Sequence, residues 1–182
     1  MIPLPTMKTP AEIDSILISE KQIEATVRSL ALKINSTYHS IPILVVGLLR
    51  GSFMFMADLV RHLDMDVELD FMTVSSYGAA TTSSTEVKII MDLGEAIAGR
   101  HVLIVEDIID TGLTLAKVME ILKGRSPASL KICTLLNKPS RRKVNVEVDF
   151  VGIDIPDHFV CGYGLDFNQR FRNLPFIGIL KK

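Results

Sequence analysis

The chain has 182 residues, 48% of them hydrophobic and 23% charged, which is the balance of a soluble globular protein with one domain and a substantial core. Its 20 basic and 21 acidic residues nearly cancel, which argues against a nucleic-acid or membrane surface built on bulk charge. No apolar run approaches the roughly 20 residues that span a bilayer. Neither a charged leader nor metal-ligand spacing of the two cysteines is seen, so we expect a cytoplasmic protein with reduced thiols.

Helical and strand-like patterns alternate along the chain. Ser19 and Gln22 have the spacing of a capping box, and the apolar residues that follow recur at helical intervals, which predicts a helix over 20–38. We expect further helices over 53–63 and 113–123, and strands over 43–47, 67–74, 87–91, 102–105, 130–136, one or two within 144–155, a short one over 159–161 and a last one over 176–180.

This alternation predicts an α/β fold with a largely parallel, twisted sheet flanked by helices. Ligands of such folds bind beyond the carboxyl ends of the strands, so the loops after Gly47, Val105 and Leu136 should converge on one rim. The small, polar segment at about 75–86 lies between two strands and predicts a flexible flap hairpin, with a plain solvent loop as the alternative.

Three carboxylates, Glu106, Asp107 and Asp110, follow the apolar strand over 102–105 within five residues. Such a cluster is costly unless a cation or hydrogen-bond donors compensate its charge. Neighbouring residues of an extended segment point to opposite sides, so Glu106 and Asp107 cannot both meet one ligand atom without a bend. Their oxygen ligands favour Mg²⁺ over zinc, whose preferred His and Cys ligands are absent here.

The residues after these acids have the character of a phosphate cradle. Gly112 permits close backbone approach, Thr111 and Thr114 carry hydroxyl donors, and a helix begins there. Neither a P-loop nor a dinucleotide fingerprint is present. A phosphorylated sugar with bound metal would satisfy both the acids and the cradle, whereas ordinary strand and helix ends are the alternative. Arg50, beside Gly51, could add a cation for a second phosphate or be a solvated side chain.

These residues resemble the phosphoribosyl-pyrophosphate signature of the type I phosphoribosyltransferases. The surrounding segments are similar to the hypoxanthine and hypoxanthine-guanine phosphoribosyltransferases over roughly residues 15 to 180. The matching segments, in chain order, are Leu48–Leu59, Asp70–Gly78, Val105–Gly112, Leu136–Arg142 and Pro156–Gly178.

The resemblance implies a single domain over 1–182, with a small hood formed by the chain ends, and a role for each matched residue. Phosphoribosyl pyrophosphate would be bound by Arg50, Gly51, Glu106, Asp107, Asp110, Thr111, Gly112, Leu113, Thr114 and Arg172. Asp110 would be the catalytic base. Leu113 stands where some relatives have lysine, so it would contribute only its backbone.

The purine would be held by Lys138, Phe159, Val160 and Asp166, and Mg²⁺ by Glu106, Asp107 and Asp166. Ser76 and Tyr77 would lie in the flap, which in relatives closes over the reacting centre and excludes water. An ammonium has only donors, so Lys138 would favour a 6-oxopurine over a 6-aminopurine.

The expected activity is therefore purine salvage, with hypoxanthine, and guanine as well, receiving the phosphoribosyl group to give IMP or GMP and pyrophosphate. A phosphoribosyl-pyrophosphate-sensing regulator that binds RNA and a xanthine-preferring transferase are the alternatives. The expected partners are small-molecule substrates, without nucleic acid or membrane, in a homodimer or homotetramer.

Overall fold

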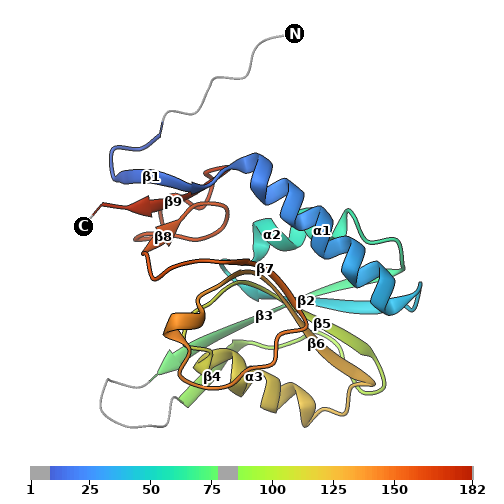
Figure 1. Cartoon of the computed structure of the whole chain (residues 1–182). Coiled ribbons are helices and arrows are strands. Elements are labelled where there is room, and N and C mark those ends of the chain that lie inside the picture. The colour runs from blue at the N-terminus through green and yellow to red at the C-terminus, as the bar shows by residue number, and fades with distance from the viewer. Residues whose placement is uncertain (1–8, 78–85, 182) are drawn as a thin grey trace.

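The computed structural model describes residues 9–77 and 86–181, and its centre is a six-stranded sheet (Figure 1). The strand order is β4-β3-β2-β5-β6-β7, and every neighbouring pair is parallel except β3 with β4. The strands are β2 (Ile43–Leu49), β3 (Val67–Tyr77), β4 (Glu86–Met91), β5 (His101–Ile109), β6 (Ser129–Asn137) and β7 (Phe150–Asp154). The α/β class and the parallel sheet are thus confirmed.

Helices cover both faces of this sheet. Helices α1 (Glu20–Tyr38) and α2 (Phe53–Val60) contribute to one core, and α3 (Leu113–Lys123) contributes to the other. The capping box of α1 is present, because the Ser19 hydroxyl accepts a bond from the Gln22 backbone N–H while Gln22 Oε1 accepts one from the Ser19 N–H at 2.9 Å. None of the helices in the described segments combines the length and apolarity needed to cross a bilayer.

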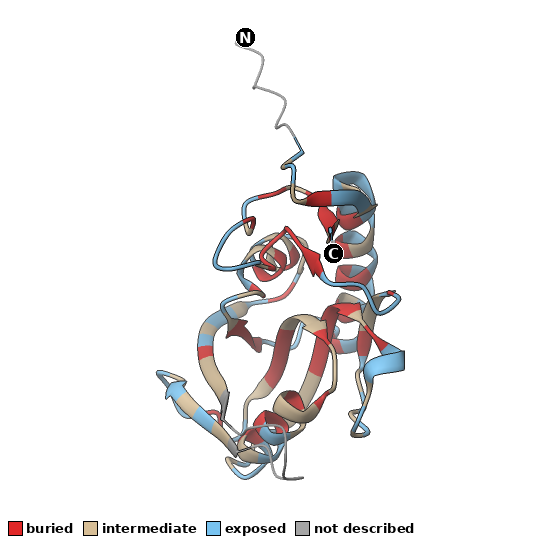
Figure 2. Cartoon of the chain, turned by 90° about the vertical axis from the view of Figure 1, so that its left-hand side faces the viewer, coloured by how far each residue is buried: buried red, intermediate tan, exposed pale blue. Residues whose placement is uncertain are grey.

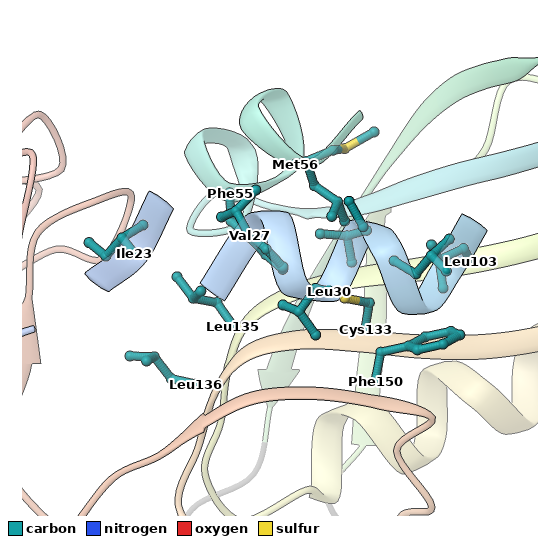
Figure 3. Packing of buried hydrophobic residues seen from close by; sticks show 14 of the residues in the cluster. Ile23, Val27, Leu30, Phe55, Met56, Leu103, Cys133, Leu135, Leu136 and Phe150 are labelled. Carbon is teal, nitrogen blue, oxygen red and sulfur yellow. The ribbon is translucent and has the colours of Figure 1, made fainter. Parts of the chain in front are cut away.

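Strand β5 is buried on both faces, which explains its unbroken apolar run. Leu103 and Val105 pack on the core of α1 and α2, while Val102 and Ile104 pack on the core of α3. Figure 3 shows side chains of α1 and α2 over Leu103 and over residues of β6 and β7. The buried strands form the middle of the molecule in Figure 2. Packing on both faces therefore fixes the position of the strand that carries the acidic cluster.

A second sheet of three strands joins the two ends of the chain, as the hood prediction requires. Its order is β1-β9-β8, and both pairs are antiparallel (Figure 1). The strands are β1 (Ile13–Ile18), β8 (Val160–Cys161) and β9 (Ile177–Leu180). The sequence analysis did not predict β1.

Several predicted boundaries were wrong. Strand β5 continues to Ile109 because its pairing with β6 persists beyond Val105, so Glu106 and Asp107 lie on the strand itself. Helix α2 ends at Val60. The prediction of one or two strands within 144–155 is confirmed, with one strand, β7, found there. Strands β3 and β4 form the hairpin expected at the flap, with Ser76 and Tyr77 in β3, but the predicted flap tip over 78–85 is outside the described residues.

Candidate active site

Three loops meet at the carboxyl edge of the parallel strands. They follow β2, β5 and β6, the three neighbouring central strands, which confirms the predicted common rim. The loop after β2 begins with a cis peptide bond between Leu49 and Arg50. Opposite these loops, the segment around β8 brings in the residues from the C-terminal part of the chain.

Two adjacent cavities at this rim contain most of the predicted site residues. The larger, of about 340 Å³, is lined by Arg50, Gly51, Asp107, Ile108, Asp110, Lys138, Phe159, Val160, Leu165, Asp166 and Arg172. The smaller, of about 130 Å³, is lined by Glu106, Ile108, Ile109, Asp110, Thr111, Gly112, Thr114 and Leu115. Ile108 and Asp110 line both cavities, so a ligand that spans them must pass Asp110.

The alternation of β5 separates the two neighbouring acids. Glu106 faces the smaller cavity and Asp107 the larger, as expected for adjacent residues of an extended segment. Glu106 Oε2 is buried, and within the described part of the chain it has no hydrogen-bond partner. Burial, reinforced by the Asp107 charge, raises the pKa of Glu106 well above its usual range. This carboxylate therefore lacks the compensation that buried charge normally has.

Asp107 is half-buried at the wall of the larger cavity, and burial raises its pKa to about 6. Its backbone hydrogen bonds and the Arg172 guanidinium act in the opposite direction, and Asp166 raises the value further. The charged forms of both neighbouring carboxylates are therefore disfavoured, and a nearby cation would relieve this cost.

Gly51 lies directly against Asp107. A Cβ atom built on Gly51 would be 1.7 Å from Asp107 Oδ2, which no side chain could accommodate without a shift of the backbone or of the carboxylate. Gly164, at φ +99°, packs in turn on Gly51, because its Cβ would be 2.0 Å from the Gly51 carbonyl oxygen. The sequence analysis identified Gly51 but not Gly164, whose role depends on a contact over more than a hundred residues.

The smaller cavity has the features of an anion site. Gly112 begins α3 with φ +80°, a left-handed conformation that glycine adopts without strain, and the first-turn N–H groups of α3 follow it. Thr111 and Thr114 line this cavity, whereas the Leu113 side chain is not among its lining groups. The Leu113 N–H approaches Thr111 Oγ1 at 3.4 Å.

Ion pairs fill the opposite side of the larger cavity. Arg172 forms a salt bridge of 2.8 Å with Asp166 and donates to the Gly164 carbonyl at 2.7 Å. Gln169 Oε1 accepts from Arg50 at 3.1 Å and from Arg172 at 3.3 Å. The predicted cations Arg50 and Arg172 are thus brought together, and Gln169, which the sequence analysis missed, links them.

Lys138 is only 7% exposed, although it lies in a loop. Its ammonium donates to the His158 carbonyl at 2.7 Å and is 3.8 Å from Asp157 Oδ1. Phe159 is 63% exposed at the mouth of the cavity, with its ring edge-to-face against Phe167 at 6.0 Å between centroids. A large aromatic ring exposed beside a buried ammonium is the arrangement expected for a planar polar ligand.

The predicted metal-binding carboxylates do not form a protein-only metal centre. Among the described residues, no three His, Cys, Asp or Glu side chains gather closely enough to hold a metal ion by themselves. In proteins, Mg²⁺ often shares its ligands with a phosphate-bearing substrate.

The basic run over residues 140–143 is mostly exposed, yet two of its side chains contact the rim. Arg141 Nε is 3.2 Å from Asp110 Oδ1. Arg142 donates to the Asp110 carbonyl at 3.3 Å and to Asn137 Oδ1. The 3-10 turn over Pro139–Arg141 directs these side chains back to the rim, which the charge pattern alone does not reveal.

The chain belongs to the phosphoribosyl transferase domain family, whose sequence model matches residues 15–168. It is 52% identical over 170 residues to the hypoxanthine-guanine phosphoribosyltransferase of Bacillus subtilis (strain 168), covering 93% of this chain and 94% of that protein. It is 57% identical over 166 residues to the hypoxanthine phosphoribosyltransferase of Haemophilus influenzae, covering 90% and 93%.

Solved structures show the same fold. The crystal structure of a hypoxanthine phosphoribosyltransferase from Staphylococcus aureus matches with a TM-score of 0.90 and 46% identity, covering 93% of this chain and 92% of that one. These comparisons confirm the family inferred from the sequence.

The contact between Gly51 and Asp107 predicts a strong effect of Gly51→Ala. The added methyl would displace the loop or the carboxylate, so kcat/KM for phosphoribosyl pyrophosphate should fall about 10²-fold, the scale of an ångström-level misplacement. Gly94→Ala is the matched control, because its Cβ would come no closer than 3.9 Å to Asp70 Oδ2. Equal kinetics of the two variants would contradict the structural role of Gly51.

The raised pKa of Asp107 predicts how stability depends on pH. The folded protein keeps a proton on Asp107 where the unfolded chain, with a carboxyl pKa near 3.8, has lost it. The free energy of unfolding should therefore decline as the pH rises from about 4 to about 6 and level off above. Urea titrations with EDTA should show a weaker decline for Asp107→Asn, and parallel curves for variant and wild type would refute this assignment.

Proposed function

We propose that this protein transfers the 5-phosphoribosyl group from phosphoribosyl pyrophosphate to hypoxanthine, and to guanine, with IMP or GMP and pyrophosphate as products. The observation that carries the proposal is the pair of adjoining cavities with Asp110 in both walls. A nucleotide needs a phosphate site and a base site with the reacting sugar between them. The two adjoining cavities offer one site each, with Asp110 at their junction. The names of the relatives support the same substrates.

The smaller cavity is assigned to the 5′-phosphate. Thr111 and Thr114 supply hydroxyl donors there, and Gly112 together with the Leu113 backbone opens the N-terminus of α3, whose dipole favours an anion. Arg50, Gly51 and Arg172 are assigned to the pyrophosphate, because they line the larger cavity and two of them carry positive charge. Ser76 and Tyr77 remain assigned to a closing flap, supported by their place at the end of the β3–β4 hairpin.

The base is assigned to the part of the larger cavity between Lys138 and Phe159. Lys138 is buried, so a hydrogen bond from its ammonium to a ligand oxygen is protected from water. It accepts no hydrogen bond and would repel the donor of a 6-amino group, which favours oxo purines. Phe159 stacks on the base and the Val160 backbone meets its edge.

Magnesium is the cofactor that the donor set fits. The unpartnered Glu106 Oε2 and the raised pKa of Asp107 both indicate carboxylates that a cation would stabilise. Glu106 and Asp107 would contact the ribose hydroxyls and the ion from the two sides of β5, and Asp166 would lie near a second ion. Bound Mg²⁺ supplies positive charge to the departing pyrophosphate.

Proton transfer is assigned to Asp110. As the purine nitrogen forms its bond to the anomeric carbon, the bond from that carbon to pyrophosphate breaks and the leaving group takes the electron pair. Asp110 accepts the proton released by the imidazole ring of the purine. Arg172 stabilises the charge that develops on the pyrophosphate.

A substrate comparison tests this function. Steady-state kcat/KM values with phosphoribosyl pyrophosphate and Mg²⁺ should be higher for hypoxanthine and guanine than for xanthine and adenine. The absence of pyrophosphate release together with tight RNA binding would overturn the proposal in favour of a regulator. A higher value for xanthine than for hypoxanthine would change the assigned substrate.

We also propose a homodimer or homotetramer in the cytoplasm. Large apolar side chains are exposed on the neighbouring strands β3 and β4, among them Leu69, Ile90 and Met91, and such surfaces are typical of subunit contacts. Cys133 and Cys161 are buried and free, which suits a reducing compartment. Light scattering on the purified protein would measure the subunit number.

Asp110→Asn tests the proton acceptor. The amide cannot take the proton, so kcat with hypoxanthine should fall by about 10² to 10⁴ while the Kd for phosphoribosyl pyrophosphate stays within about threefold. Asp66→Asn, an exposed carboxylate that precedes β3 at the opposite edge of the sheet, is the control. Near-normal turnover of Asp110→Asn would exclude this role.

Lys138→Met tests the base site. The variant keeps an apolar chain of similar length but loses the donors, so kcat/KM for hypoxanthine should fall about 10- to 100-fold, as expected for a hydrogen bond from a charged group. Binding of phosphoribosyl pyrophosphate alone, measured by calorimetry, should change little. Equal losses in both measurements would contradict the assignment of Lys138 to the purine.

A further inference from the structure

A chain of four charged side chains connects Asp110, the assigned proton acceptor, with Lys138 of the base site. Arg141 Nε lies 3.2 Å from Asp110 Oδ1 and 3.7 Å from Asp157 Oδ1. Asp157 Oδ1 is in turn 3.8 Å from Lys138 Nζ. Two carboxylates and two cations thus alternate in the order Asp110, Arg141, Asp157, Lys138. Arg141 and Asp157 were assigned no role above.

The segment that carries Arg141 is fixed to the loop that carries Asp110. The Lys143 N–H donates to the Thr111 carbonyl at 3.0 Å, and Arg142 donates to the Asp110 carbonyl at 3.3 Å. The Arg142 side chain also packs on Gly112, where a Cβ would come within 3.1 Å of it. These contacts of Arg142 and Lys143 therefore hold Arg141 close to Asp110.

The ion pairs themselves are weak enough to exchange. The side chains of Arg141, Asp110 and Asp157 are 48%, 43% and 52% exposed, and pairs of that exposure contribute little to stability. The same Nε atom lies within ion-pair distance of both carboxylates, so a small side-chain movement can change its partner.

We propose that Arg141 is a positioning residue for Asp110, and that its guanidinium passes to Asp157 when Asp110 is neutralised by the purine proton. This inference rests on the proposed function. Before transfer, Arg141 holds Asp110 through Oδ1 and leaves Oδ2 directed to the purine. After transfer, Asp110 is a neutral acid and Asp157 supplies the counterion.

The step balances without a further reactant. The proton leaves the purine imidazole nitrogen and binds to Asp110 Oδ2, while the nitrogen gains its bond to the anomeric carbon and pyrophosphate leaves with its electron pair. Arg141 stays protonated throughout, as a guanidinium does in proteins. Only its ion-pair partner changes.

The first experiment separates positioning from general charge. Arg141→Met should lower kcat about tenfold with hypoxanthine and leave the Kd for phosphoribosyl pyrophosphate within about twofold of wild type. Arg141→Lys, which keeps the charge, should recover part of the lost kcat. Lys143→Met removes a charge from the same segment at an exposed position and should retain wild-type kcat. An Arg141→Met variant as active as Lys143→Met would overturn the proposal.

The second experiment is a double-mutant cycle with Asp157→Asn, which tests the exchange of partners. Asp157→Asn should lower kcat in the wild-type background. It should leave kcat unchanged in the Arg141→Met background, because that variant lacks the guanidinium that would pass to Asp157. Its effect on the KM for hypoxanthine, transmitted through Lys138, should be the same in both backgrounds. Equal factors on kcat in both backgrounds would refute the exchange.

Thermal unfolding of each variant provides the check on folding, and midpoints near that of wild type are expected for exposed ion pairs. Should Arg141→Met fail to fold, Arg141→Lys and the Asp157→Asn cycle built on it still decide the outcome. An inactive wild-type protein would overturn the proposed function itself. If the wild type is active, but Arg141→Met behaves like Lys143→Met and Asp157→Asn has the same effect in both backgrounds, only the role of Arg141 is overturned.

Discussion

The site depends on the burial of two adjacent carboxylates, Glu106 and Asp107, at the end of a strand packed on both faces. Burial of a charge without a partner is among the costliest arrangements in a folded protein. The rigid strand keeps both acids in place, and its alternation gives each a different cavity. The fold therefore bears the cost of two carboxylates whose charged forms burial disfavours, and a cation bound beside them would reduce that cost.

The charges of the site are largely satisfied by one another. Arg172 is paired with Asp166, Arg141 with Asp110, and Lys138 with the His158 carbonyl. A substrate therefore exchanges existing partners for its own phosphates and base edge, and gains only the difference between the two sets. This arrangement favours ligands that replace several pairs at once, and it disfavours a lone phosphate or base. Glu106 differs, because its buried Oε2 has no hydrogen-bond partner within the described residues.

Local signals in the sequence predicted those parts of the fold and site that depend on local contacts. The capping box at Ser19 and the bounds of α3 were confirmed because capping and helical periodicity act within a few residues. Strand β1 was missed because it forms by pairing with β9 from the other end of the chain. The continuation of β5 through its acids was missed for a similar reason, since β6 provides the hydrogen bonds.

The same distinction between local and long-range contacts holds for the residues of the site. The spacing of Glu106, Asp107 and Asp110 was informative because one strand and one helix start carry them. Arg141 and Gln169 look like solvated polar residues in the sequence, and only the folding back of their turns gives them partners.

The small sheet can be completed only at the end of synthesis, because β9 is the last strand of the chain. Strand β8, which follows Phe159, pairs with β9, and the Leu180 N–H donates to the Phe159 carbonyl. All six strands of the central sheet, with the phosphate loop, are translated before β9 emerges from the ribosome. The pairing that holds the segment beside Phe159 therefore depends on the last strand to be synthesised. A chain that ends before β9 would keep all six strands of the central sheet but would lose the strand that pairs with β8.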